Sequence, residues 1–151
     1  MLDTGEAAPS FDLENQAGDV VSLADYRGQW VVVYFYPRAD TPGCTTEACE
    51  FRDNWDAFSD HDIAVIGISD DPVADLESFA DSYDLPFELC SDPDGSVASA
   101  YESYGEKNVF GNVVEGVFRN TYVVDPDGEI AATFEGVSPE GHAEEVLATI
   151  R

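Results

Sequence analysis

Basic residues are scarce in this 151-residue sequence: five arginines and one lysine stand against 32 acidic residues, which gives a formal net charge of −26. Such a chain repels nucleic acid and anionic lipid, so binding to either is not expected. No apolar run approaches the roughly 18 residues of a spanning helix. The amino-terminal segment also has no basic cluster followed by an apolar stretch, so no secretory signal peptide is predicted. We therefore expect a cytoplasmic protein.

The acidic residues are scattered in ones and twos rather than gathered in a tail, which indicates a solvated acidic surface. Self-repulsion destabilises such a chain in dilute buffer, and molar salt shortens the screening length to about 3 Å. We therefore predict a salt-rich, halophilic environment. A melting temperature that stays flat or falls as KCl is added would contradict this prediction.

The hydrophobic pattern predicts one α/β domain over residues 1–151, with a mixed central sheet and helices on both faces. Continuous β-branched and aromatic runs predict buried strands at 31–36 and 63–68. Between them, apolar residues at three- and four-residue steps predict a helix over 41–59. The other expected elements are an amino-terminal edge hairpin around 16–19, a short strand at 87–90, a hairpin of 121–124 with 129–134, and helices at 71–83, 96–104 and 141–150.

Three cysteines occur, at positions 44, 49 and 90, and an odd count without a signal peptide argues against structural disulfides. Cys44 directly follows a predicted strand and stands in the first turn of a helix. Thr41 suits the N-cap position and Pro42 the first helical position, which leaves Cys44 third with a free backbone N–H. The positive end of the helix dipole favours a thiolate there, which indicates a reactive cysteine.

The spacing Pro37-x-x-x-Thr41-x-x-Cys44, with Glu47 three residues on, resembles the peroxidatic motif of the peroxiredoxins. The surrounding stretch 34–53 is similar to the bacterioferritin-comigratory, or Q-type, branch of that family. Similarity extends from position 8 to the segment 119–125, and so covers nearly the whole chain. The resemblance implies a thioredoxin-like fold and a thiol-dependent peroxidase that reduces hydrogen peroxide and organic hydroperoxides.

The same resemblance implies a role for each residue of the site. Cys44 is the nucleophile, and the Thr41 hydroxyl and the Cys44 N–H contact the peroxide. Arg119 holds sulfur and peroxide electrostatically, since arginine remains charged and presents a rigid fork of donors. Pro37 shields the nucleophile from solvent, and Glu47 orients Arg119. No metal, heme or flavin is implied. A thioredoxin-like dithiol is the expected reductant, and a monomer is expected rather than a dimer.

Cys49 is the predicted resolving cysteine, because the sulfenic acid on Cys44 must be captured before further oxidation. Five residues of helix correspond to a rise of about 7.5 Å and a rotation of about 140°, which separates the two α-carbons by roughly 8 to 9 Å. A disulfide tolerates only about 7 Å, so the helix must unwind in each cycle. A core position for Cys49 is the alternative. Cys90 is interpreted as a buried structural thiol, with a resolving role left open.

Other functions fit less well. A thioredoxin-type disulfide reductase needs Cys-x-x-Cys, whereas Cys44 and Cys49 are separated by four residues. The three cysteines with His61 and His142 show none of the usual zinc spacings, and both histidines are expected to be solvent-exposed. The two Asp-Pro-Asp-Gly segments are typical of turns and lack the calcium-loop pattern. A non-catalytic acidic thioredoxin-fold protein that binds a partner or a metal is the remaining alternative.

Overall fold

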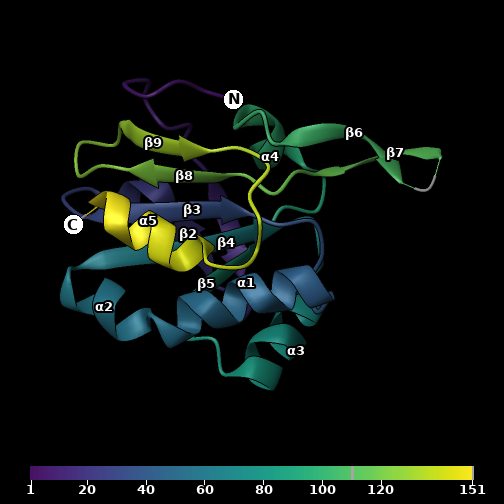
Figure 1. The fold of residues 1–151 in the computed structure, drawn as a ribbon, viewed down its shortest axis with the longest axis horizontal. Helices are drawn as coiled ribbons and strands as arrows, with labels where there is room; N and C mark the ends of the chain where they lie inside the picture. The colour runs from purple at the N-terminus through teal and green to yellow at the C-terminus, as the bar shows by residue number, and fades with distance from the viewer. Residues whose placement is uncertain (110, 151) are drawn as a thin grey trace.

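The structure is a computed structural model that describes residues 1–109 and 111–150. Its seven-stranded central sheet has the order β2-β1-β5-β4-β3-β8-β9 (Figure 1). The strands of the described residues are β1 (Asp12–Asn15), β2 (Val20–Ser22), β3 (Trp30–Phe35), β4 (Ile63–Ser69), β5 (Glu88–Ser91), β6 (Tyr104–Val109), β7 (Asn112–Val117), β8 (Thr121–Val124) and β9 (Ile130–Phe134). The helices are the 3-10 helix η1 (Leu23–Tyr26), α1 (Pro42–Asp53), α2 (Trp55–Asp60), α3 (Val73–Tyr83), α4 (Ser96–Ala100) and α5 (His142–Ile150).

The sheet is mixed, as the sequence predicts. β3, β4 and β5 pair in parallel, and β8 and β9 extend the sheet antiparallel on the β3 side. The amino-terminal hairpin of β1 and β2 forms the opposite edge. The parallel strands are continuous apolar runs because packed side chains cover both of their faces.

Helices cover the two faces of the sheet unequally. Apolar residues of α1, α2, α3 and α5 pack on one face, against Val32 and Tyr34 of β3. Among the described residues, the helices on the other face are the short α4 and η1, which pack with Phe11 of the amino-terminal segment against Val31 and Val33. Figure 1 shows the four longer helices gathered on one side of the sheet. Alternate side chains of β3 therefore face opposite cores, and α1 packs on the face of Val32 and Tyr34.

Two expectations about local structure are wrong, and one hairpin was not expected. The helix predicted over 41–59 is interrupted at Asn54, whose backbone N–H and side-chain amide both donate to the Glu50 carbonyl at 3.1 and 2.9 Å. This competition ends α1 and lets α2 begin in a new direction. The helix predicted over 96–104 ends at Ala100, because the chain turns through a positive φ of 51° at Glu102. The β6–β7 hairpin, which extends away from the main sheet in Figure 1, was not predicted.

Among the described residues, no helix has both the length and the apolar character needed to cross a bilayer.

Candidate active site

Cys44 lies in the first turn of α1, just beyond the carboxyl end of β3. Pro42 takes the first helical position and Cys44 the third, as predicted, and the side chain is only 1% exposed. Within the described residues, nothing accepts a hydrogen bond from the Cys44 backbone N–H, whereas the next N–H, of Thr45, bonds the Thr41 carbonyl at 2.8 Å. An unsatisfied N–H at a helix start can therefore bind a substrate oxygen beside the sulfur.

Arg119 reaches this helix from the segment between β7 and β8. Its Nη2 donates to Cys44 Sγ at 3.2 Å, and its Nη1 donates to Glu47 Oε1 at 2.8 Å. Cys44 and Glu47 stand three residues apart on α1, so one guanidinium spans both side chains. The Arg119 carbonyl also accepts a bond from the Val137 N–H at 2.9 Å, which holds its backbone in place. The geometry thus joins residues that lie 75 positions apart in the sequence.

Glu47 is almost completely buried, with 1% exposure, and this burial raises the pKa of its carboxyl to about 7. Arg119 opposes the rise through its charge and its hydrogen bond, while Oε2 has no hydrogen-bond partner among the described residues. Burial lowers the pKa of Arg119, but Glu47 and Cys44 outweigh it and leave that pKa raised. The guanidinium therefore stays charged beside the sulfur, as an electrostatic role requires.

Thr41 occupies the N-cap position of α1 but does not cap it. Its hydroxyl instead donates to the Arg38 carbonyl at 2.8 Å, in the loop that leads from β3 into the helix. Thr41 is at the expected N-cap position, but the expected capping bond is absent, because the hydroxyl is oriented toward the Arg38 carbonyl and its oxygen accepts no bond from the first-turn N–H groups. The hydroxyl keeps two acceptor lone pairs. Arg38 itself is exposed and lines a separate acidic pocket with Asp71 and Asp75.

A pocket of about 480 Å³ lies beside Arg119. Pro37, two residues beyond the end of β3, and Phe118 contribute apolar surface to its lining. Lys107, on β6, also lines this pocket. The sequence pattern alone assigned no role to this residue. Its only signal in the sequence is rarity, since no other lysine occurs in the chain.

Cys49 shares α1 with Cys44 but stands on a more exposed side of it. Burial raises the pKa of its thiol. Near it, Arg52 donates to the Tyr83 carbonyl at 2.8 Å and so ties this side of α1 to α3. α1 is continuous from Pro42 to Asp53, so a bond between the two sulfurs requires part of the helix to unwind.

Cys90 lies on the other side of the sheet. It is fully buried on β5 among Ile66 and Ile68 of β4, whereas Cys44 belongs to the core on the α1 face. Burial raises the pKa of the Cys90 thiol to about 12. The sheet separates Cys90 from Cys44, which supports the interpretation of a structural thiol.

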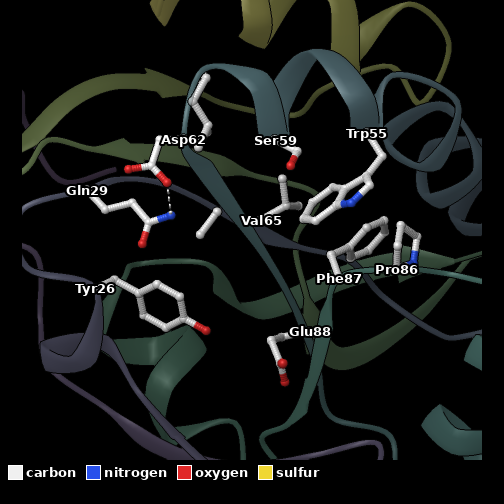
Figure 2. A pocket seen from close by; sticks show the side chains of 11 residues that line it. Tyr26, Gln29, Trp55, Ser59, Asp62, Val65, Pro86, Phe87 and Glu88 are labelled. Atoms are coloured by element: carbon white, nitrogen blue, oxygen red, sulfur yellow. Dashed lines mark hydrogen bonds between the residues drawn. The ribbon is translucent and has the colours of Figure 1, made fainter.

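A second hollow, of about 240 Å³, opens at the amino ends of the parallel strands, opposite the end that carries Cys44. Figure 2 shows Trp55 beside Phe87 in its wall and the bond from Gln29 Nε2 to Asp62 Oδ1, which measures 3.4 Å. Its lining contains neither a cysteine nor an arginine. It therefore contributes nothing to the chemistry of Cys44.

His142 is buried, with 2% exposure, so the expectation of an exposed histidine at this helix start is wrong. Its Nε2 contacts Thr121 Oγ1 at 2.8 Å, and its ring packs edge-on against Phe51 and Phe134. Its place at the α5–α1 contact explains the burial. His61 is exposed, as expected. Over residues 1–109 and 111–150, no three His, Cys, Asp or Glu side chains group together in a way that could hold a metal ion.

Comparisons with known proteins agree with this site. The sequence model described as "AhpC/TSA family" matches residues 4–133. A protein of Mycobacterium tuberculosis is 50% identical over 141 residues, which cover 93% of this chain and 90% of the relative. The Escherichia coli protein named "Peroxiredoxin Bcp" is 41% identical over 146 residues, or 97% of this chain and 94% of its own length.

Solved structures show the same similarity. A cysteine-to-serine mutant of Xylella fastidiosa PrxQ superposes with a TM-score of 0.93 at 31% identity, and covers 99% of this chain and 96% of its own. The Xanthomonas campestris bacterioferritin comigratory protein superposes with a TM-score of 0.90 at 32% identity, over 97% and 96% of the two chains. The thioredoxin-like fold expected from the sequence is confirmed.

Proposed function

We infer that this chain, which belongs to the AhpC/TSA family and to its bacterioferritin-comigratory peroxiredoxin branch, reduces hydroperoxides with the thiol of Cys44. The chain is a thiol peroxidase, as the sequence predicts. The observation that supports Cys44 as the nucleophile is its 3.2 Å contact with Arg119, whose other nitrogen is held by Glu47. The Xanthomonas campestris relative is described by its alkyl peroxide reduction activity, which extends our proposal to organic hydroperoxides.

In the proposed first step, the Cys44 thiolate attacks the distal oxygen of the hydroperoxide. The S–O bond forms as the O–O bond breaks, so sulfur is oxidised to a sulfenic acid and the other oxygen leaves as water or an alcohol once protonated. Negative charge moves from sulfur onto the leaving oxygen. The Arg119 guanidinium and the Cys44 N–H are placed to stabilise it. The Thr41 hydroxyl oxygen can accept a hydrogen bond from the hydroperoxide O–H, since its own proton is donated to the Arg38 carbonyl.

The second proposed step is capture of the sulfenic acid by Cys49. The Cys49 sulfur displaces hydroxide from the Cys44 sulfur, which gives a disulfide and water. The first turn of α1 must unwind for this, and it then loses the bond from the Thr45 N–H to the Thr41 carbonyl and that from the Thr46 hydroxyl to the Pro42 carbonyl. Both threonines are β-branched and form helix weakly, which lowers the cost. A thioredoxin-like dithiol then returns both cysteines to thiols.

The experiment that tests this proposal is a titration with one equivalent of hydrogen peroxide in high-salt buffer. Thiols are then counted and the peptides mapped by non-reducing mass spectrometry. We expect one equivalent to consume two thiols and to yield a disulfide between Cys44 and Cys49. Cys90→Ser serves as the matched control and should behave like the unmodified protein, whereas Cys49→Ser should stop at the sulfenic acid.

The outcomes separate the possible cycles. A disulfide between Cys44 and Cys90 in the Cys49→Ser variant would overturn the assignment of the resolving cysteine. An unoxidised Cys44 would overturn the peroxidase function itself and leave a non-catalytic binding protein. A cytoplasmic, salt-rich location and a monomeric state stay predictions from the sequence.

A further inference from the structure

Lys107 is the only lysine in a chain with 32 acidic residues, and the fold places it in the lining of the pocket that also contains Arg119. It stands on β6 and lines the 480 Å³ pocket together with Arg119, Pro37 and Phe118. Its Nζ lies 5.9 Å from the centre of the Phe118 ring. The β6–β7 hairpin therefore brings a second positive charge to the pocket lined by Arg119, the residue that contacts Cys44 Sγ.

Within the described part of the chain, no carboxylate lies within 4.0 Å of the Lys107 ammonium. The two acidic residues of the same pocket, Glu102 and Glu135, lie 3.1 and 3.9 Å from the amino-terminal ammonium. Lysines on so acidic a protein find carboxylate partners easily at the surface, so an unpaired and half-buried lysine is unusual here. Its charge is available to an incoming anion.

The charges around Lys107 agree with its position in the same pocket as Arg119. Burial lowers the pKa of Lys107 and the charge of Arg119 lowers it further, whereas the charges of Cys44 and Asp70 raise it by less, so the pKa is lowered overall. Lys107 therefore interacts with both partners of the sulfur–guanidinium pair. A pocket of this volume holds a medium-sized organic molecule, and its apolar wall at Phe118 and Pro37 suits a hydrocarbon segment.

We propose that Lys107 is a specificity-determining residue that selects hydroperoxides carrying a carboxylate group. The carboxylate pairs with the Lys107 ammonium, the hydrocarbon segment contacts Phe118 and Pro37, and the peroxide oxygens reach Arg119 and Cys44. This inference rests on the proposed peroxidase function. It assigns a selective role to the pocket: Arg119 is already paired with Glu47 and Cys44, so Lys107 is the cation that can offset the repulsion between a chain of net charge −26 and an anionic substrate.

The test compares a medium-chain hydroperoxy carboxylic acid with its methyl ester, which has nearly the same shape and no charge. The ratio of kcat/KM for the acid to that for the ester is the readout. In Lys107→Met we expect this ratio to fall by about tenfold, the effect of one charge-assisted hydrogen bond, mainly through KM. Lys107→Arg should keep most of the ratio. Arg38→Met removes the same charge from an exposed position outside the pocket and should leave the ratio unchanged.

Two further results bear on the proposal. In the unmodified protein the ratio should fall as the pH rises through the lowered pKa of Lys107, and in Lys107→Met this pH dependence should disappear. An equal acid-to-ester ratio in Lys107→Met and the unmodified protein would overturn the inference, and so would an equal loss in Arg38→Met. Failure of the unmodified protein to reduce hydrogen peroxide would instead overturn the proposed function, so the two failures are distinguishable.

Discussion

Cys44 and Cys90 are both buried cysteines, with 1% and 0% exposure, yet the two faces of the sheet give them opposite surroundings. Cys90 lies in an apolar core, where burial raises the pKa of its thiol to about 12. Cys44 has a guanidinium nitrogen 3.2 Å from its sulfur and a free helix-start N–H. Burial alone disfavours the thiolate form of a cysteine, whereas a positive charge within hydrogen-bond distance of the sulfur favours it.

The largest expected effect on peroxide reduction comes from replacing Cys44, with replacement of Cys90 as the comparison. Cys44→Ser should lower the rate of hydrogen peroxide reduction by at least about 10³-fold, because a hydroxyl is a far weaker nucleophile than a thiolate. Cys90→Ala should retain the rate. Peroxide consumption, measured with a chemical dithiol as reductant, checks both. A comparable loss in Cys90→Ala, with the protein still folded by circular dichroism, would show that the two faces are not functionally separate.

Arg119→Lys sharpens the comparison, because it removes the two-nitrogen geometry of the guanidinium while keeping a positive charge. A single ammonium cannot contact Cys44 and Glu47 with the geometry of the guanidinium. We expect kcat/KM for hydrogen peroxide to fall by about 10²-fold, as for the loss of one donor to a developing charge. Stopped-flow measurement of peroxide reduction checks this. Retention of the full rate would show that charge alone, without the paired geometry, activates Cys44.

Glu47→Gln tests how much stability the protein loses by burying the carboxylate that holds Arg119. The pKa of the Glu47 carboxyl rises from 4.5 to about 7 on folding, so folding favours the protonated form. Its contribution to stability is therefore complete below pH 4.5 and is lost as the pH rises through 7. The loss is about 3 kcal/mol, at roughly 1.4 kcal/mol per pKa unit.

Urea unfolding at pH 5 and pH 8 measures this effect. Relative to the unmodified protein, Glu47→Gln should gain roughly 2 to 3 kcal/mol in the free energy of unfolding between the two pH values, since a small part of the contribution is already lost at pH 5. Glu77→Gln, an exposed position on α3, is the matched control and should gain little. An equal gain in the two variants would attribute the pH dependence to the acidic surface as a whole.

Gly43→Ala is expected to have the smallest effect, since it moves Arg119 without replacing it. A Cβ at this position would lie 3.2 Å from Arg119 Nη2 and 3.4 Å from Pro139 Cγ, so the guanidinium must shift by a few tenths of an ångström. We expect kcat/KM to fall by roughly fivefold. The midpoint of urea unfolding should stay the same or rise, because alanine favours the helix over glycine by about 1 kcal/mol. An unchanged rate would show that the contact with Cys44 tolerates displacement.

Most of the fold could be predicted from local pattern. The buried runs at β3 and β4, the turn between β8 and β9, and the amphipathic α5 all carry their signal within a few residues. The break at Asn54 and the β6–β7 hairpin could not be predicted in the same way. At Asn54 a side-chain amide competes for one carbonyl, and β6 and β7 carry glycines and charges in place of a clear alternation.

The sequence by itself determined the helix start that presents Cys44, because proline at the first turn and the preceding buried strand act over short distances. The motif around it also carried the family resemblance. Only the tertiary structure decided which side chains surround the sulfur. Arg119 and Lys107 arrive from segments more than 60 residues away, and Cys90 is kept from the site because it is buried in the core on the opposite face of the sheet. Long-range packing sets these distances, and no local propensity encodes them.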